Sequence, residues 1–549
     1  MASLTPMQGA LGYRHAAHLL RRTSYRFTKA KVDEMAGQTA AEALATLLQL
    51  YPLQLDQPVY PNSDLPGVPP ITWVYPPGGN LPTQDFMLRP WVVSWWTNES
   101  LYDPGIGHRM AFFLHQFNVV DILSFATTHF CDYLFLLRWG ALGNFKSFIT
   151  KMVTDNCMLR YLNNTENSKN NPNENFAREF FELFTIGKGP QIGPGDYTNY
   201  TEDDIVVAAR LFTGFRIRGQ RNVIDTDTML PRGDVNFAQH DVDPKTFSDK
   251  FQSTTIQGAS NADEMWTELA ALVDMTFAQP ETARNFCRRL YHFFVSRNIT
   301  SEIESDIIVP LADTMIANNY EIKPVLEQLL QSQHFFDMDD SDNSDEIIGG
   351  LIKSPVELAL QSISFFDLPI PDPMTETQAF FQFYNRGVAQ RMFAQANMPL
   401  FYPFDVAGYP AYYQAPDFNR QWFNASTIVA RYKLPAMLLS GKLTIGGSAN
   451  QPLGVQLNIA DWIKSSGVVS DATDPYVLVQ DLLQYMLPES PDSDRFNYFY
   501  ITVFLDNLPP ADWTYEWQNY LDTGDATEVT LALERLINSI MYSAEYQLF

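Results

Sequence analysis

Apolar residues recur every three to four positions over most of this chain, whereas alternating apolar and polar residues are scarce. The first spacing is typical of amphipathic helices, and strict alternation is typical of half-buried strands. Two segments rich in proline and tyrosine, Tyr60–Pro82 and Pro399–Asn424, interrupt the helical pattern and are expected to be long ordered loops. We therefore predict a mostly α fold, a multi-helix globular body with little or no sheet.

The length of the chain bounds its domain organisation. With 549 residues, of which 46% are hydrophobic, the chain can bury a large core and form more than one domain. We divide it into an N-terminal helical region (1–218), an irregular polar segment (219–260) and a C-terminal helical region (261–549). We expect the two helical regions to pack together as one compact unit.

The charge and the motifs of the chain limit the classes of partner and cofactor that we expect. A formal net charge of −26 disfavours nucleic acid and anionic membranes, because both bind through lysine and arginine. No apolar run reaches the about 18 residues of a transmembrane helix. The N-terminus lacks the pattern of a signal peptide, so we expect a cytoplasmic protein or one exported by a route that the sequence does not reveal. No nucleotide-binding motif occurs, and no nucleotide cofactor is expected.

The segment Asn170–Gly189 contains the densest group of charged residues on a helical pattern. Asn171 is expected to cap a helix that starts at Pro172 and ends at Gly187. At about 100° per residue, one arc of this helix carries every charge and the other carries four phenylalanines. The polar arc consists of Glu174, Asn175, Arg178, Glu179 and Glu182. This arc is either a solvated ladder of ion pairs or the wall of a cleft suited to acid–base chemistry.

A second helix is predicted over Tyr200–Gly214, with Thr201 as its N-cap and Gly214 as its end. Beyond the acidic first turn, its only charged residue is Arg210. A helix that is apolar nearly all round is buried, and a buried guanidinium needs a carboxylate. Asp203 and the glutamates at the end of the preceding helix are the candidate partners. The residues assigned to this structural network are Asn173, Asn175, Asp203 and Arg210.

The histidines supply further candidate functional residues. His240, Asp241 and Lys245 place a base, an acid and a cation on one irregular loop, where functional groups are common; a turn stabilised by Asp241 is the alternative. A divalent cation is a candidate cofactor. The candidate metal ligands are Glu174, Glu182 and His115. The acidic loop Asp337–Glu346 lacks the glycine and the final glutamate of an EF-hand, so we expect a solvated loop.

Seven segments of the chain match a known pattern in the same order. They are "HAAHLLRRTSYRFT", "NPNENFAREFFELFTIGKG", "YTEDDIVVAARLFTG", "HDVDPKTFS", "CRRLYHFFV", "LIKSPVEL" and "FYPFDVAGYPAYYQ", the last continuing to "WFN". Together they resemble the bacterial domain-of-unknown-function family 1800 (DUF 1800), most closely its Bacteroidetes-type members, over residues 15–435. The matching signature positions are Asn173, Glu174, Asn175, Arg178, Glu179, Glu182, Glu202, Asp203, Arg210, Gly214, His240, Asp241 and Lys245.

The resemblance implies no settled activity. Where the family usually has "NHF", this chain has "HQF", so Gln116 stands in place of a histidine. A family site that needs this histidine would be altered here. The resemblance also implies a partner, a sulfatase- or phosphatase-like protein of unknown family 1501, and a shared extracytoplasmic pathway.

Two functions of different classes fit these observations. The first is an enzyme whose buried polar cleft acts on a polar or polymeric substrate, with Glu179 or Glu182 as acid–base group or cation ligand and His240 as a second base. The proposed catalytic residues are Arg178, Glu179, Glu182, His240, Asp241 and Lys245. The second is a non-catalytic structural or assembly protein, a homo-oligomer in its simplest form, that uses its aromatic loops as interaction surfaces.

Overall fold

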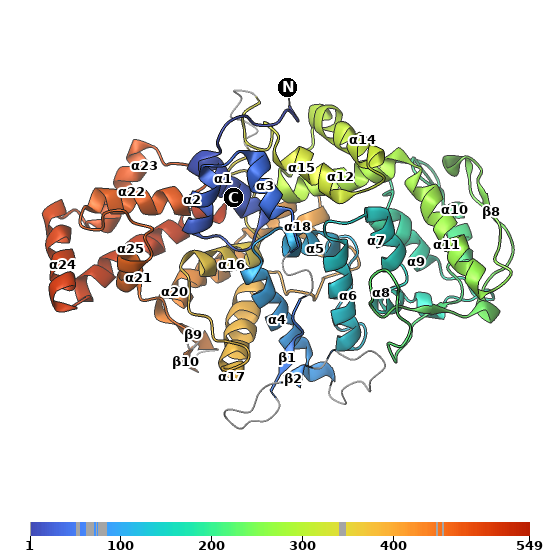
Figure 1. Cartoon of the computed structure of the whole chain (residues 1–549), viewed down its shortest axis with the longest axis horizontal. Coiled ribbons are helices and arrows are strands. Elements are labelled where there is room, and N and C mark those ends of the chain that lie inside the picture. The colour runs from blue at the N-terminus through green and yellow to red at the C-terminus, as the bar shows by residue number, and fades with distance from the viewer. Residues whose placement is uncertain are drawn as a thin grey trace.

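Helices make up most of the computed structural model, which describes residues 2–50, 55–61, 71–72, 74, 85–339, 347–445, 448–452 and 455–549. The mostly α fold predicted from the spacing of apolar residues is therefore confirmed. One connected cluster of buried apolar side chains extends from Met7 to Tyr546 along the chain. In Figure 1, α21–α25 lie at one end of the molecule and α8–α11 lie at the other.

The helices follow in chain order. The N-terminal part contains α1 (Gly12–Thr23), α2 (Lys29–Ala36), α3 (Ala40–Leu47), η1 (Asp85–Met87), α4 (Arg89–Tyr102), α5 (Gly107–His115), α6 (Thr127–Gly140), α7 (Phe145–Met152), α8 (Asn156–Tyr161), η2 (Asn164–Glu166), α9 (Glu174–Glu179), η3 (Phe180–Phe184) and α10 (Glu202–Leu211). The middle part contains η4 (Phe237–Gln239), η5 (Asp249–Phe251), α11 (Ala262–Phe277), α12 (Pro280–Phe294), α13 (Ser301–Ile303), η6 (Glu304–Ile308), α14 (Val309–Ala317), α15 (Ile322–Leu330) and α16 (Pro355–Phe365). The C-terminal part contains α17 (Thr377–Phe381), η7 (Gln382–Phe393), α18 (Pro410–Tyr413), η8 (Phe418–Trp422), α19 (Thr427–Arg431), α20 (Lys433–Ser440), α21 (Ile459–Ser465), α22 (Pro475–Met486), α23 (Ser493–Asn497), η9 (Tyr498–Phe504), α24 (Pro510–Thr523), α25 (Thr527–Tyr542) and η10 (Glu545–Gln547).

Two helices form the centre of the body. Every residue of α5 and every residue of α16 is buried. A helix that is mostly apolar all round has no face to offer to water, so these two are enclosed by the others. Ser354 caps α16, and its hydroxyl and the Glu357 carboxylate form a capping box.

The described strands are short and pair only as two-stranded antiparallel hairpins. The pairs are β1 (Val59–Tyr60) with β2 (Ile71–Thr72), β3 (Gln191–Gly193) with β4 (Asp196–Tyr197), β5 (Phe215–Arg216) with β6 (Asp234–Val235), β7 (Lys245–Thr246) with β8 (Thr255–Ile256), and β9 (Lys442–Ile445) with β10 (Ser448–Pro452). The prediction of little sheet is confirmed for the described residues.

The second aromatic segment, Pro399–Asn424, turns much of its aromatic surface inward. It contains α18 and η8, and Tyr409 and Trp422 are buried, whereas Phe404 is 51% exposed. Most of Tyr60–Pro82 and of Asp337–Glu346 lies outside the described residues. No helix among the described residues is long and apolar enough to span a membrane.

Candidate functional site

The motif helix α9 begins two residues later than predicted. Asn173, not Asn171, is its N-cap, and its side-chain oxygen accepts a hydrogen bond from the Asn175 N–H at 3.0 Å. The Asn173 N–H in turn donates to Asn167 Oδ1 at 2.9 Å, and Asn167 Nδ2 donates to the Ala209 carbonyl of α10 at 2.9 Å. The start of the helix is thus determined by hydrogen bonds that lead through Asn167 to a neighbouring helix. A capping pattern in the local sequence does not reveal these contacts.

After α9 the chain widens into a π-helical turn, η3. The Thr185 hydroxyl donates to the Phe180 carbonyl at 2.7 Å, and the Gly187 N–H donates to the Phe181 carbonyl at 2.8 Å. Gly187, at φ +72°, ends the segment as predicted. A π turn changes the angular spacing of side chains, and such turns are frequent at functional sites. The predicted α-helical relation between Glu179 and Glu182 therefore does not hold.

The charged ladder of the motif is half-solvated. Arg178 forms a two-fold ion pair with Glu202 of α10, at 2.9 and 2.6 Å, and lies 3.7 Å from Glu174 and 3.9 Å from Glu182. The side chains of Arg178 and Glu202 are 30% and 37% exposed. The Arg178 guanidinium lowers the pKa of the Glu202 carboxyl. Glu182 also accepts a hydrogen bond from the Tyr200 hydroxyl, so this ladder joins α9 and η3 to α10 at the surface.

Glu179 differs from the rest of the polar arc because it is buried, with 9% of its surface exposed. No hydrogen bond or ion pair joins its carboxyl to another described residue. Burial, followed by the repulsion of Glu182, raises the pKa of Glu179 to about 7. A carboxyl with a pKa near neutrality can both give and take a proton under ordinary conditions.

Arg210 does not pair with Asp203, Glu179 or Glu182, so the predicted partners of Arg210 are wrong, although Arg178 and Glu202 form an ion pair between the two helices. Its guanidinium instead binds Asp241, with Nε 2.8 Å from Oδ2 and Nη2 3.1 Å from Oδ1. Arg210 is also only half-buried, and Asp203 is exposed. The reason is that α10 packs against α9, β7 and α11 but leaves one face open, on which Val206 is 42% exposed.

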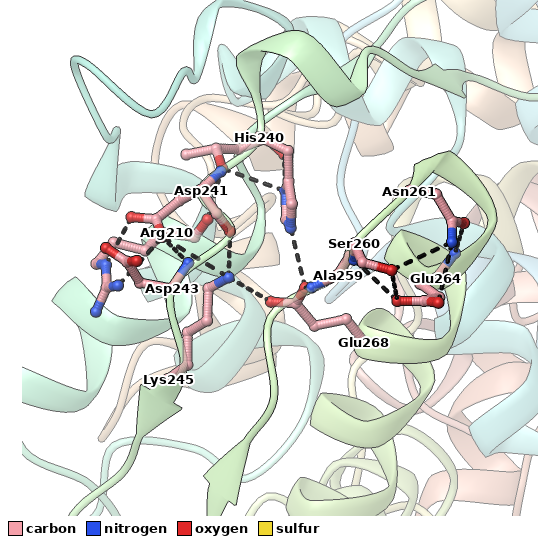
Figure 2. A network of polar contacts seen from close by, with 11 residues as sticks. Arg210, His240, Asp241, Asp243, Lys245, Ala259, Ser260, Asn261, Glu264 and Glu268 are labelled. Carbon is pink, nitrogen blue, oxygen red and sulfur yellow. Dashed lines mark hydrogen bonds and ion pairs between the residues drawn. The ribbon is translucent and has the colours of Figure 1, made fainter.

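His240 and Lys245 lie in the interior and not on an accessible loop. Figure 2 shows both side chains directed at Glu268 of α11. His240 Nε2 lies 2.9 Å from Glu268 Oε2, and Lys245 Nζ lies 2.7 Å from Oε1. His240 Nδ1 lies 2.8 Å from the Thr213 carbonyl, and Lys245 Nζ donates to the Asp241 carbonyl. All three ionisable side chains are at most 1% exposed.

These contacts tie β7 to both α10 and α11, and they leave His240 and Lys245 with no open side toward a substrate. Sequence reasoning missed Glu268, which lies 28 residues after His240. A signal was nevertheless present, because Glu268 shares the buried stripe of α11 with Met265, Leu269 and Leu272. A carboxylate on an apolar stripe needs a buried cationic partner.

The candidate metal ligands are not brought together. His115 is buried on α5, where Nδ1 lies 2.7 Å from the Tyr133 hydroxyl. Burial lowers the pKa of His115 to about 3. Glu174 and Glu182 contact Arg178 instead. Within the part of the chain that the structure describes, no three His, Cys, Asp or Glu side chains are grouped so that they could hold a metal ion.

A cavity of about 300 Å³ lies beside η3, between α5, α12 and the second aromatic segment. Its lining residues are Phe113, Gln116, Phe117, Leu183, Asn285, Arg288, Arg289, His292, Phe293, Ala407, Tyr412, Tyr413 and Phe418. Three of the segments that carry the family resemblance meet in these walls, together with "HQF", where the chain departs from the family pattern. Mostly aromatic walls with a few polar groups are typical of small-molecule sites.

Two adjacent arginines of α12 differ in how their charge is balanced. Arg288 pairs with Glu281 at 2.5 Å and with Glu304 at 2.7 and 2.9 Å. Arg289 donates to two main-chain carbonyls of η3, those of Leu183 at 2.7 Å and Glu182 at 3.3 Å. No carboxylate among the described residues pairs with Arg289, and burial lowers its pKa to about 10. Arg289 therefore brings an unbalanced positive charge to the cavity wall.

The fold and the cavity define a mostly α protein with an aromatic pocket that carries Arg289 on its wall. The model of the family described as "Protein of unknown function (DUF1800)" matches residues 18–548, so the chain belongs to this family. The match reaches well beyond residue 435, where the resemblance read from the sequence ends. No curated protein and no solved structure matches the chain.

Proposed function

We propose that this protein binds a small organic anion with an aromatic or apolar body in the cavity between α5, α12 and Pro399–Asn424. The observation that carries the proposal is the Arg289 guanidinium, which lines the cavity and donates hydrogen bonds to neutral main-chain carbonyls, those of Leu183 and Glu182. A half-buried cation binds an anion more strongly than an exposed one, because water screens it less.

The remaining walls fit such a ligand. Phe113, Phe117, Phe293 and Phe418 supply aromatic surface, and His292 stacks on Phe418 with ring centres 4.6 Å apart. Burial lowers the pKa of His292 to about 4, so its ring is neutral near pH 7 and adds no second positive charge. The volume is at the lower end of the roughly 300–1,000 Å³ usual for ligand sites, which favours a single-ring ligand.

Glu179 supports an enzymatic version of this proposal. It lies in the same short segment as the two carbonyls that hold Arg289, and Asp405 acts on it from the aromatic segment. Tyr413, which lines the cavity, donates to Asp405 at 2.8 Å. Glu179 would then be the acid–base residue, in the segment that borders the cavity at Leu183. The contacts of Arg178, Glu182, His240, Asp241 and Lys245 favour positioning roles for those five catalytic candidates.

Isothermal titration calorimetry with benzoate and phenyl phosphate tests the proposal, with benzyl alcohol as the neutral analogue. We expect both anions to bind and benzyl alcohol to bind at least tenfold more weakly. Arg289→Gln should weaken anion binding by about 10- to 100-fold, the equivalent of a charge-assisted hydrogen bond. The matched control is Arg284→Gln on the same helix, whose side chain is 39% exposed and pairs with Glu281. No heat from either anion at millimolar concentration, or equal binding by Arg289→Gln, would contradict the proposal.

The assembly function is retained as a second candidate. Phe404, Val406 and Tyr413 are 51%, 39% and 41% exposed on the aromatic segment and form an apolar surface. A homo-oligomer through this surface is a proposal that rests on these exposed side chains. A partner from family 1501 and a Bacteroidetes-type origin are proposals that rest on the resemblance. Light scattering on the wild type and on Phe404→Ser tests the first: a monomeric wild type would remove it.

A further inference from the structure

A second group of basic side chains lies deep in the centre of the molecule, around Glu357 of α16. Its members are Arg21 and Arg22 of α1, Arg109 of α5, Lys353 before α16, and Arg431 of α19. None of the five is more than 4% exposed, and Glu357 is also 4% exposed. Burial of a charge is unfavourable unless an opposite charge balances it. We call these five residues the basic cluster.

The acidic side chains near the basic cluster already accept hydrogen bonds from identified donors. Arg109 Nη1 binds Glu357 Oε1, and Glu357 Oε2 accepts from the Ser354 N–H at 2.6 Å. Asp337, whose charge also acts on Arg22, accepts from the N–H groups of Ile347 and Ile348 at 2.7 and 2.8 Å. Glu489, whose charge acts on Arg21, pairs with Arg14. Three carboxylates therefore act on five basic side chains.

Carbonyl and amide oxygens accept hydrogen bonds from three other members of the basic cluster. Arg21 donates to the Tyr485 carbonyl at 2.6 Å, and Lys353 donates to the Tyr546 carbonyl at 2.9 Å. Arg431 donates to Gln547 Oε1 at 2.7 Å and to the Lys353 carbonyl at 3.0 Å. These acceptors are neutral, so they do not balance the charge of a protonated side chain. Burial accordingly lowers the pKa of Arg431 to about 9 and that of Lys353 well below its usual range.

Three buried N–H groups of the basic cluster reach no acceptor among the described residues. They are Nε and Nη1 of Arg22 and Nη2 of Arg109. The two arginines are direct neighbours, since Arg109 Nε lies 3.2 Å from the Arg22 carbonyl. Both guanidinium groups also lie near the Phe549 ring, at 4.8 and 6.0 Å from its centre. Figure 1 shows the C-terminus beside α1, in agreement with these distances.

We infer that a small inorganic anion of halide size binds between Arg22 and Arg109 at the centre of the fold. It would accept the three N–H groups and reduce the excess of positive charge. The close surroundings favour a monatomic ion, because both arginines are at most 1% exposed and an aromatic ring closes one side. The bound ion would join α1, α5, α16 and the C-terminal segment. This site is separate from the cavity at Arg289, and its anion is inorganic.

Thermal unfolding of the full chain in different sodium salts tests the inference. Chloride and bromide are compared with gluconate, which is too large for the site, at equal pH and ionic strength. We expect the halides to raise the Tm of the wild type by a few degrees, saturably with concentration, because a ligand of the folded state alone stabilises it. Arg22→Met should lose this halide dependence. The matched control is Arg221→Met, because Arg221 is also buried but pairs with both oxygens of Asp132. The Tm of this variant should still depend on halide.

Bromide diffraction gives a second measurement that does not depend on the folding of Arg22→Met. Crystals of the wild type grown in sodium bromide should show an anomalous peak between the Arg22 and Arg109 guanidinium groups. The inference would be overturned by equal Tm values of the wild type in halide and gluconate. It would also be overturned by bromide peaks at the protein surface only, which would identify an adventitious ion only.

Discussion

Lys245 Nζ lies 2.7 Å from Glu268 Oε1, and the two side chains are 0% and 1% exposed. This pair joins β7 to α11 across 23 residues of sequence, and His240 adds a second contact to the same carboxylate. A buried charge pair contributes little net stability compared with apolar residues, but the removal of one partner leaves the other charge uncompensated. The contact therefore constrains how the irregular segment 219–260 docks on the helices.

Glu268→Gln is expected to lower the free energy of unfolding by about 3–5 kcal/mol, because it removes the carboxylate closest to the buried Lys245 and leaves only that of Asp241, 3.9 Å away. Urea denaturation followed by circular dichroism measures the loss. Glu264→Gln is the control, because Glu264 lies one turn earlier on α11 and is exposed; it should change the value by less than about 0.5 kcal/mol. A loss below 1 kcal/mol for Glu268→Gln would show that water reaches the pair.

Glu179→Gln is expected to change the pH dependence of stability. The pKa of Glu179 is about 7 in the folded protein against an ordinary value of 4.5, so the folded state holds one more proton between these pH values. The free energy of unfolding of the wild type therefore falls as pH rises from 4.5 to 7. The variant lacks this fall and should be more stable than the wild type at about pH 8, by on the order of 1–3 kcal/mol.

Urea denaturation of the wild type and Glu179→Gln at about pH 4 and pH 8 checks this difference. At the lower pH the two proteins should be nearly equal. Glu174→Gln removes a carboxylate whose side chain is 50% exposed and should show no gain at the higher pH. An equal effect of both substitutions would mean that Glu179 is solvated.

The Arg210–Asp241 pair is expected to couple weakly, since its side chains are 26% and 14% exposed. A double-mutant cycle with Arg210→Gln and Asp241→Asn should give a coupling energy of about 1 kcal/mol. The same cycle with Asp203→Asn in place of Asp241→Asn should give a value near zero, because Asp203 is exposed and is not the partner of Arg210. Coupling to Asp203 would show that Asp203 is a partner of Arg210 in solution.

Gly214→Ala is expected to destabilise the protein by about 1–3 kcal/mol. Gly214 has φ +85°, and a Cβ there would lie 2.8 Å from the Asn236 carbonyl oxygen. Thermal unfolding measures the effect. Gly37→Ala is the control, because Gly37 has φ −85° and open space around the added carbon, so its Tm should not fall.

Several local features were predictable because neighbours in sequence determine them. Thr201 caps α10, and its hydroxyl accepts from the Asp204 N–H, as the capping pattern indicates. Gly187 and Gly214 both adopt positive φ at the ends of their segments. Family membership was also predictable, since it depends on the order of motifs along the chain.

Partners of charged side chains were not predictable in the same way. Arg210 and Asp241 are 31 residues apart, and His240 and Glu268 are 28 apart. Angular positions on one helix identify which side chains share a face, but they do not identify the element that covers it. The π turn after Glu179 also departs from the regular helix on which those positions depend.

Helical periodicity, the N-cap of α10, the glycine ends at Gly187 and Gly214, and the family were thus encoded in short stretches of residues, whereas the start of α9 was not. The packing of distant elements determined the burial of Glu179, the enclosure of His240 and Lys245, and the cavity beside Arg289. The physical reason is that charge balance and solvent exposure depend on which segments pack against each other. One set of helices is compatible with many packing arrangements.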